Sequence, residues 1–186
     1  MSMPPRLRKV VLTSHVVTSV GWPGAVLAYL ALDITAVTSE NVQTVRGAYL
    51  AMDVIVRYAI VPLALASLLV GTVNALGTPW GLFRHYWVLV KLLLTVFAAA
   101  VLLMEVQTVS HLSQAAASSA DPRTLPGTLL HSVGGLVVLL LTVVLSVFKP
   151  PGVTRYRWRK QNEQQRTRST RPTAATPRAA APPAAG

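Results

Sequence analysis

Three ionisable side chains, Arg57, Glu105 and His131, lie at matching distances from the ends of three long apolar segments. Each is 18 to 20 residues from the same end of its own segment. If the segments are helices, which rise about 1.5 Å per residue, the three side chains share one level about 27–30 Å from that end. A guanidinium, a carboxylate and an imidazole at one level predict either a structural ion pair or a site for a proton or a metal ion.

The residue types allow two interpretations of this polar level. In the first, Arg57 and Glu105 form an ion pair that fixes helix register, assisted by Asp53 one turn from Arg57, because charge inside a bilayer is costly and usually pairs. In the second, Glu105, His111 and His131 form a small polar site that opens outward and binds a proton or a divalent metal. Histidine and carboxylate ligands suit Zn²⁺, Cu²⁺ or iron, although the spacing matches no known metal motif.

A further candidate lies near the start of the first apolar segment. His15 is the sixth residue of the segment that begins at Val10, and a neutral imidazole on a membrane helix can ligate haem iron. The alternative is a structural histidine hydrogen-bonded to a neighbouring helix through Ser14, Thr18 or Asn74. The chain has no Ser-His-Asp order, glycine-rich phosphate loop or HExxH motif, so we predict no catalytic residue and do not expect an enzyme.

These groups depend for their placement on four apolar segments. The chain has 186 residues, of which 52% are hydrophobic and only 12% charged, and its mean hydropathy is +0.50. A soluble domain carries about 25% charged residues, and a helix of about 20 apolar residues crosses a bilayer core. We therefore predict an all-α bundle of four transmembrane helices in one domain, residues 1–152, with spans at about 10–32, 54–77, 86–108 and 128–148.

Residues 153–186 differ from this domain in composition. They are rich in Arg, Pro and Ala and have almost no apolar periodicity, so they cannot bury enough surface to offset the entropy of ordering. We predict a disordered basic tail that is either solvated or in contact with anionic lipid head groups, to which each nearby basic residue adds about 1 kcal/mol. We do not expect nucleic-acid binding. The absence of cysteine excludes disulfides, thiolate metal sites and thiol nucleophiles.

The distribution of charge predicts the topology. Of the 17 basic residues, all but Arg46, Arg57 and Arg123 lie before the first span, near the turn between the second and third spans, or after the fourth. All acidic residues except Glu163 fall on the other side. Because Lys and Arg accumulate in cytoplasmic loops, four spans with both termini in the cytoplasm satisfy every loop.

Three short stretches of the chain have a distinctive pattern. They are residues 14–24 (SHVVTSVGWPG), residues 77–91 (GTPWGLFRHYWVLVK) and residues 131–135 (HSVGG), the last followed by Lys149-Pro150. They resemble a group of small four-helix integral membrane proteins of unknown function that are common in actinobacteria. The resemblance covers about residues 5–160 and implies a multi-pass protein of the bacterial inner membrane, without an established activity.

The first of these stretches also has a wider similarity. A histidine followed by Trp22-Pro23-Gly24 looks like the copper-resistance-D-like and protoporphyrinogen-oxidase-like membrane families. In the latter a first-helix histidine is a haem ligand, and the resemblance maps this role onto His15. The lysine-bearing motif of that oxidase family is represented only by Lys91, so the resemblance does not extend to its activity.

The function expected from the sequence is accordingly general. We expect an integral membrane protein without an assigned specific role, held together by a polar cluster near the outer face. The alternatives are a haem- or metal-binding membrane protein and a small proton-coupled transporter or subunit that uses Glu105 and Arg57. The sequence does not determine the oligomeric state.

Overall fold

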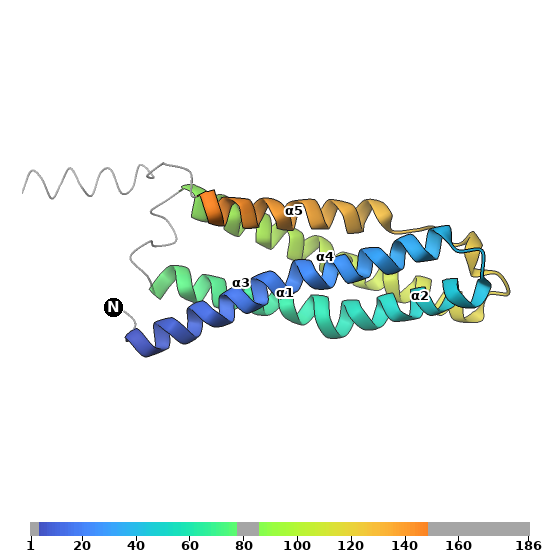
Figure 1. Ribbon diagram of the computed structural model, residues 1–186, viewed down its shortest axis with the longest axis horizontal. Helices are drawn as coiled ribbons and strands as arrows, with labels where there is room; N and C mark the ends of the chain where they lie inside the picture. The colour runs from blue at the N-terminus through green and yellow to red at the C-terminus, as the bar shows by residue number, and fades with distance from the viewer. Residues whose placement is uncertain (1–3, 78–85, 149–186) are drawn as a thin grey trace, which may run out of the picture.

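The computed structural model describes residues 4–77 and 86–148, which form an antiparallel bundle of helices with no strand in these ranges (Figure 1). A π-helical turn, Val56–Ile60, joins the second and third helices end to end, so the bundle consists of four rods. The predicted all-α, four-helix fold is confirmed, whereas the predicted disordered tail lies outside the described residues. The five long helices are α1 (Pro5–Thr38), α2 (Val42–Ile55), α3 (Val61–Gly77), α4 (Tyr86–Ser118) and α5 (Leu129–Phe148).

The four rods pack as a ring. α1 lies between the α2–α3 rod and α5, and α4 lies between the same two elements on the opposite side. The end of the bundle that holds the first residues of α1 and α4 is called the basic end below (Figure 1). The other end, called the loop end, holds the connections from α1 to α2 and from α4 to α5. Consecutive rods are therefore antiparallel, as in a four-helix bundle with short connections.

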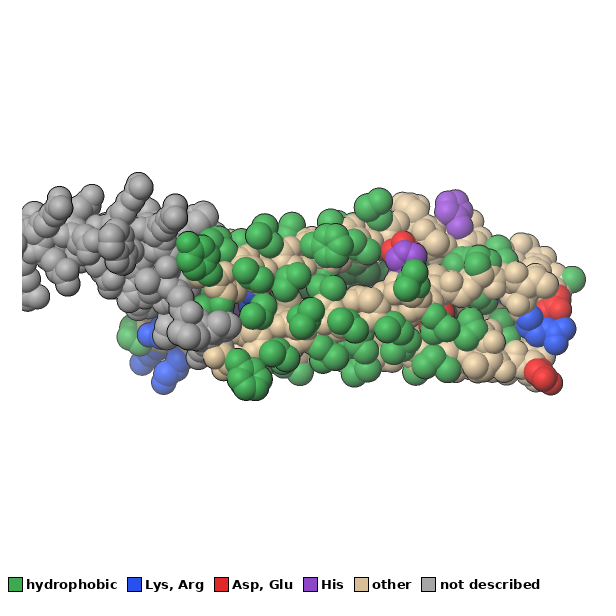
Figure 2. Space-filling view, turned by 90° about the horizontal axis from the view of Figure 1, so that it is seen from above, with side chains coloured by type: hydrophobic (Ala, Val, Ile, Leu, Met, Phe, Trp, Pro, Cys, Tyr) green, Lys and Arg blue, Asp and Glu red, His purple; other side chains and the backbone are tan. Residues whose placement is uncertain are grey.

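The outside of the bundle is apolar. Four rods are each long and apolar enough to cross a membrane, and large hydrophobic side chains such as Leu69, Leu93, Met104 and Val147 are exposed. Figure 2 shows hydrophobic side chains along most of one face, with blue groups toward both ends, red groups at the loop end and a further red group beside a purple histidine within the face. A bilayer solvates such a surface, and the helices satisfy their backbone groups internally, so the fold is compatible with a multi-pass integral membrane protein surrounded by lipid.

The buried face of α1 continues beyond the first predicted span. The buried residues of α1 follow one another at intervals of three or four positions, which places them on one side of the helix. They are Trp22, Val26, Tyr29, Asp33 and Ala36. Because this stripe packs against the other helices as far as Ala36, α1 extends to Thr38 rather than ending near residue 32. The connection to α2 is correspondingly short, and Asn41 caps α2 by accepting hydrogen bonds from the N–H groups of Gln43 and Thr44.

The π-helical turn coincides with a proline. Pro62 has no N–H group, and its ring crowds the carbonyl of Tyr58 four residues earlier. The chain accommodates this by widening one turn, in which the N–H of Val61 donates to the carbonyl of Val56. π-Turns inside helices occur frequently at functional sites, and both Val56 and Ile60 line the cavity described below.

Polar contacts hold the loop end together. Arg46 donates from Nε to the carbonyl of Ala116 over 3.0 Å and from Nη2 to the carbonyl of Ser119 over 2.7 Å. A cation thus covers the last carbonyls of α4, where the helix dipole favours positive charge. The Tyr49 hydroxyl lies 3.4 Å from the carbonyl oxygen of Leu125. These bonds fix the connection that returns the chain to α5.

An exposed ion pair at the loop end should make the stability of the fold depend on pH in the acidic range. Arg123 Nη2 lies 2.7 Å from Asp121 Oδ2, and hydrogen bonds from Arg123 lower the pKa of Asp121 from 3.8 to about 2. Because the folded-state pKa is below the unfolded value, the pair stabilises the fold fully above about pH 4, and this contribution is lost as the pH falls toward 2. We expect Arg123→Gln to flatten that part of a plot of unfolding temperature against pH. An unchanged slope in the variant would contradict this assignment.

Candidate functional site

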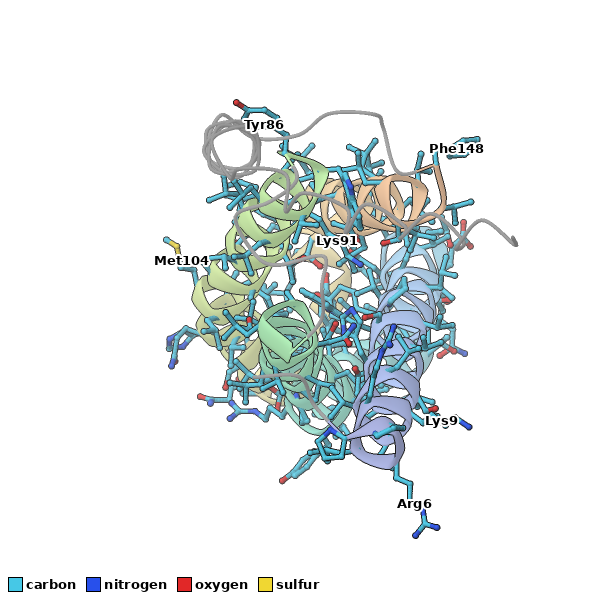
Figure 3. All side chains as sticks on the ribbon, turned by 90° about the vertical axis from the view of Figure 1, so that its left-hand side faces the viewer. Arg6, Lys9, Tyr86, Lys91, Met104 and Phe148 are labelled. Atoms are coloured by element: carbon cyan, nitrogen blue, oxygen red, sulfur yellow. The ribbon has the colours of Figure 1, made fainter. Side chains whose placement is uncertain are left out.

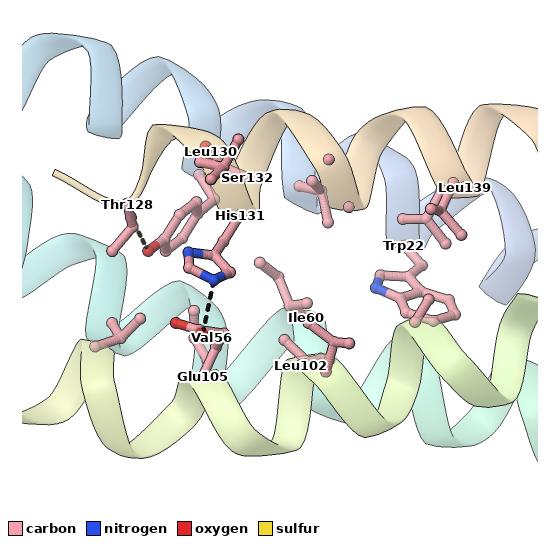
Figure 4. Close-up of a pocket in the computed structure, with 18 of the residues that line it drawn as sticks. Trp22, Val56, Ile60, Leu102, Glu105, Thr128, Leu130, His131, Ser132 and Leu139 are labelled. Carbon is pink, nitrogen blue, oxygen red and sulfur yellow. Dashed lines mark hydrogen bonds and ion pairs between the residues drawn. The ribbon is translucent and has the colours of Figure 1, made fainter.

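A cavity of about 290 Å³ lies inside the bundle, in the region between α4 and α5 that Figure 4 shows. All four rods contribute to its walls, with Trp22 on α1, Ile60 in the π-turn, Leu102 on α4 and Leu139 on α5. The lining is mostly apolar and includes a small number of polar side chains. A concave, mainly apolar site with a few polar groups is the usual form of a small-molecule site in proteins.

The ionisable groups at the cavity are Glu105 on α4 and His131 on α5. His131 Nε2 lies 3.2 Å from Glu105 Oε1, and Figure 4 shows the two side chains directed toward each other from facing helices. The His131 side chain is 53% exposed and the Glu105 side chain 22%, so the imidazole lies nearer the mouth. Within the described residues, Glu105 Oε2 and His131 Nδ1 have no hydrogen-bond partner, and both atoms are available to a ligand.

A buried polar network forms the loop-end wall of the cavity. The hydroxyls of Thr128 and Ser132 each donate to Asp33 Oδ2 over 2.9 Å, and the N–H of Thr128 donates to Asp33 Oδ1 over 3.2 Å. The Tyr29 hydroxyl lies 2.7 Å from Thr128 Oγ1. Because that hydroxyl gives its proton to Asp33, Tyr29 is the donor. The carboxylate thus caps the N-terminus of α5, where the helix dipole favours negative charge.

Sequence reasoning did not identify Asp33 as part of this network. A signal was present, because Asp33 follows Tyr29 by four residues and precedes Ala36 by three, which is the spacing of a core-facing stripe. Its partners Thr128 and Ser132 lie 95 and 99 positions away in the chain. Their contact depends on how α1 and α5 pack together, which helical periodicity alone does not determine.

Two glycines of α5 leave space beside the Glu105–His131 pair. Gly134 and Gly135 both line the cavity, and a Cβ atom added to either would meet no other atom within 4 Å. A larger side chain at Gly135 would therefore occupy part of the cavity without an initial clash. This position offers a way to close the site while leaving its polar groups intact.

Arg57 does not pair with Glu105. Its Nε lies 2.9 Å from Asp53 Oδ1, and its Nη2 donates to Ser110 Oγ over 2.6 Å. The structure thus divides the predicted cluster into two pairs, Asp53 with Arg57 and Glu105 with His131. The reason is rotational: Glu105 and Ser110 are separated by about 140° around α4, so one meets α5 and the other meets the α2–α3 rod.

His111 lies apart from the Glu105–His131 pair. It follows Glu105 by six residues on α4, and its side chain is exposed. Among the described residues, no three His, Asp or Glu side chains converge as the ligands of a metal ion would. Of the three predicted metal ligands, the structure therefore brings together Glu105 and His131 alone.

His15 lies nearer the basic end and does not line the cavity. Its ring packs against α3, where a Cβ atom added to Gly71 would lie 2.8 Å from the ring Cε1. Its Nδ1 lies 3.3 Å from Ser19 Oγ, which lies 2.9 Å from Ser67 Oγ. The imidazole is thus a hydrogen-bonded residue between α1 and α3, although its partners are not those expected from the sequence. The ring packs against the backbone of α3 at Gly71, and haem ligation by His15 stays a prediction.

Comparison of the chain with protein-family models, with curated proteins and with solved structures finds no match. The fold and the apolar surface define the class, a membrane-compatible four-rod helical bundle. The function is therefore argued below from the cavity and from the polar groups at its mouth.

Proposed function

We propose that this protein binds an amphipathic, membrane-soluble molecule in the cavity between α4 and α5. The observation that carries the proposal is an apolar cavity of about 290 Å³ with the Glu105–His131 pair at its edge. The apolar body of the molecule would occupy the cavity, and its polar head would lie at the pair. Charged groups inside a bilayer are costly and usually mark functional sites, which supports a role for the pair beyond packing.

The chemistry of the pair favours a hydroxyl head group. Glu105 Oε2 accepts a hydrogen bond when ionised, and because His131 Nε2 faces this carboxylate, His131 Nδ1 accepts in the neutral imidazole and donates in the imidazolium. A hydroxyl donates to Glu105 Oε2 and accepts from the Nδ1–H group of the imidazolium, so a long-chain alcohol or a phenol is complementary to the charged pair. The exposed neighbours Phe97 and Leu130 line the same cavity, so the ligand would enter sideways from the lipid.

A proton-linked version of this function is a second candidate. The observation in its favour is the contact between a carboxylate and an imidazole, which can exchange a proton with each other and with a bound hydroxyl. In that version, movement of the ligand would be coupled to a proton held by Glu105 and His131. Arg57 would contribute only indirectly, because its contacts are with Asp53 and Ser110.

The setting of this function is part of the proposal. We place the protein in a bacterial inner membrane, as a relative of the four-helix proteins that its sequence resembles. The basic end would face the cytoplasm, because most of the Lys and Arg residues lie in the first turns of α1, near the start of α4 or after α5. The basic tail would then lie near the anionic head groups of the inner leaflet.

Trp22 allows a direct test, because its buried indole lines the cavity. The other three of the four tryptophans are replaced by Phe, and the detergent-purified protein is titrated with a brominated long-chain phenol. We expect saturable quenching of Trp22 fluorescence at one molecule per chain. Gly135→Leu, which fills the cavity, should lower the quenching at least twofold. Glu105→Gln should weaken binding about tenfold, because a hydrogen bond to a charged group contributes about 1.5–3 kcal/mol.

The matched control is Gly24→Leu. Gly24 is exposed, does not line the cavity and has no atom within 4 Å of an added Cβ, so this variant should bind the probe like the parent protein. Quenching that increases in proportion to the probe without saturation would contradict the proposal. Equal quenching in Gly135→Leu and Gly24→Leu would also contradict it.

A further inference from the structure

At the basic end, one lysine turns into the bundle while other cations turn away from it. Figure 3 looks onto this end and shows Arg6 and Lys9 projecting outward from α1, whereas Lys91 lies among the helices. Lys91 is half-buried, and its Nζ donates to Ser146 Oγ on α5 over 2.6 Å. The Ser146 hydroxyl donates in turn to the carbonyl of Thr142 over 2.8 Å. The ammonium group is thus held between α4 and α5 by a hydroxyl that is itself fixed.

The described surroundings of Lys91 contain hydroxyls and an imidazole but no carboxylate. On α1 and α3, His15, Ser19 and Ser67 form a hydrogen-bonded chain, and Lys91 is near enough to His15 for its positive charge to act on the imidazole. The acidic residues of the described chain all belong to its loop-end half. They are Asp33, Glu40, Asp53, Glu105 and Asp121.

An ammonium in this position lacks a compensating charge. A lysine near the end of a membrane helix usually extends its flexible stem toward water or lipid head groups, whereas Lys91 is directed to a hydroxyl inside the bundle. An ammonium has three donors, and Ser146 accepts from one of them without adding negative charge. Because a buried cation is costly unless an anion pairs with it, the site is complementary to an anion from outside the described chain.

We propose that Lys91, positioned by Ser146, binds a phosphate group at the basic end of the bundle. Lys91 is five residues from Tyr86, the first residue of α4, which corresponds to about 7–8 Å along the helix. This is near the depth at which lipid head groups meet the hydrocarbon. An anionic phospholipid head group or free phosphate can supply the same chemistry. The site is independent of the cavity, because neither Lys91 nor Ser146 lines it.

The test measures the unfolding temperature of the full chain in detergent with dioleoyl-phosphatidylglycerol, dioleoyl-phosphatidylcholine or inorganic phosphate. We expect the anionic lipid to raise the unfolding temperature more than the zwitterionic lipid does. Lys91→Gln should raise the phosphatidylglycerol concentration for a half-maximal shift about tenfold, which is the loss expected for one charge-assisted contact. Lys9→Gln, which removes an outward cation at the same end, should change it less than twofold.

The remaining outcomes separate the two sources of phosphate. A shift produced by inorganic phosphate alone, and lost in Lys91→Gln, would support the site and assign it to free phosphate. The proposal would be overturned if Lys91→Gln and Lys9→Gln needed the same phosphatidylglycerol concentration for a half-maximal shift in unfolding temperature. Gly135→Leu should leave these values unchanged, so failure of the cavity proposal would not affect this one.

A second measurement applies if Lys91→Gln does not fold. In native mass spectrometry, we expect the parent protein to retain one phosphatidylglycerol molecule at collision energies that remove phosphatidylcholine. Ser146→Ala keeps the charge of Lys91 but removes the group that directs it inward, and it should lower this retention at least twofold. Equal retention of the two lipids by the parent protein would overturn the proposal.

Discussion

The Asp33→Ala variant is expected to lose about 2–4 kcal/mol of stability, because a buried donor left without an acceptor costs about 1–3 kcal/mol. Asp33 is completely buried and accepts hydrogen bonds from the N–H of Thr128 and from the hydroxyls of Thr128 and Ser132. In the variant the two donors of Thr128 would remain covered without their acceptor, and the Ser132 hydroxyl would keep only the carbonyl of Leu129 at 3.1 Å. The N-terminus of α5 would lose its cap. The loss can be measured by denaturation in mixed micelles followed by circular dichroism.

Two comparisons make this prediction specific. Glu40→Ala removes an exposed acid near the same end of the bundle, and its effect should stay within about 0.5 kcal/mol. Asp33→Asn keeps one acceptor oxygen but turns an amide group toward hydroxyl donors, so its loss should be intermediate. A loss in Asp33→Ala no larger than that in Glu40→Ala would show that the network does not stabilise the fold.

The same network connects the stability of the fold to the shape of the cavity. Tyr29, Thr128 and Ser132 all line the cavity, and Asp33 fixes the positions of the last two directly. Along the chain, His131 follows Thr128, which binds Asp33, and precedes Gly134 and Gly135, which line the cavity. A buried carboxylate that ties α1 to α5 therefore holds the wall against which a ligand would pack, without being part of the Glu105–His131 pair.

Residue counting along each helix predicted the heights of polar groups better than it predicted their partners. The rise per residue is nearly constant in a helix, so Glu105 and His131 were placed at one level, and their side chains do meet at 3.2 Å. Rotation about the helix axis depends on how neighbouring helices pack. For this reason the sequence indicated a pair between Arg57 and Glu105, whereas Arg57 meets Asp53 and Ser110.

The cavity could not be predicted from hydropathy for the same reason. The apolar segments predict four membrane-compatible helices because length and composition decide whether a helix can cross a bilayer. Whether the side chains fill the space between these helices depends on their sizes at each contact. Gly134 and Gly135 on α5 leave a volume beside Trp22 on α1, and no periodic pattern in either segment indicates that these residues line the same space.

The Gly127→Ala variant is expected to lose about 1–3 kcal/mol of stability through overpacking. A Cβ atom at Gly127 would lie 2.6 Å from Val37 Cγ1, and a β-branched side chain has little freedom to turn away. Gly127 also precedes Thr128, so a shift of the backbone would stretch the hydrogen bonds to Asp33. The measurement is unfolding in mixed micelles. Gly24→Ala is the control for an added methyl group, because a Cβ atom at Gly24 would meet nothing within 4 Å.

A second substitution distinguishes this steric explanation from others. Val37 is 44% exposed, so Val37→Ala should cost little alone, and it removes the atom that a Cβ at Gly127 would meet. The double variant with Gly127→Ala and Val37→Ala should therefore recover most of the lost stability. Strictly additive losses would show that the clash is not the cause. In an Asp33→Ala background, Gly127→Ala should cost less than in the parent protein, because the hydrogen bonds that it stretches are already absent.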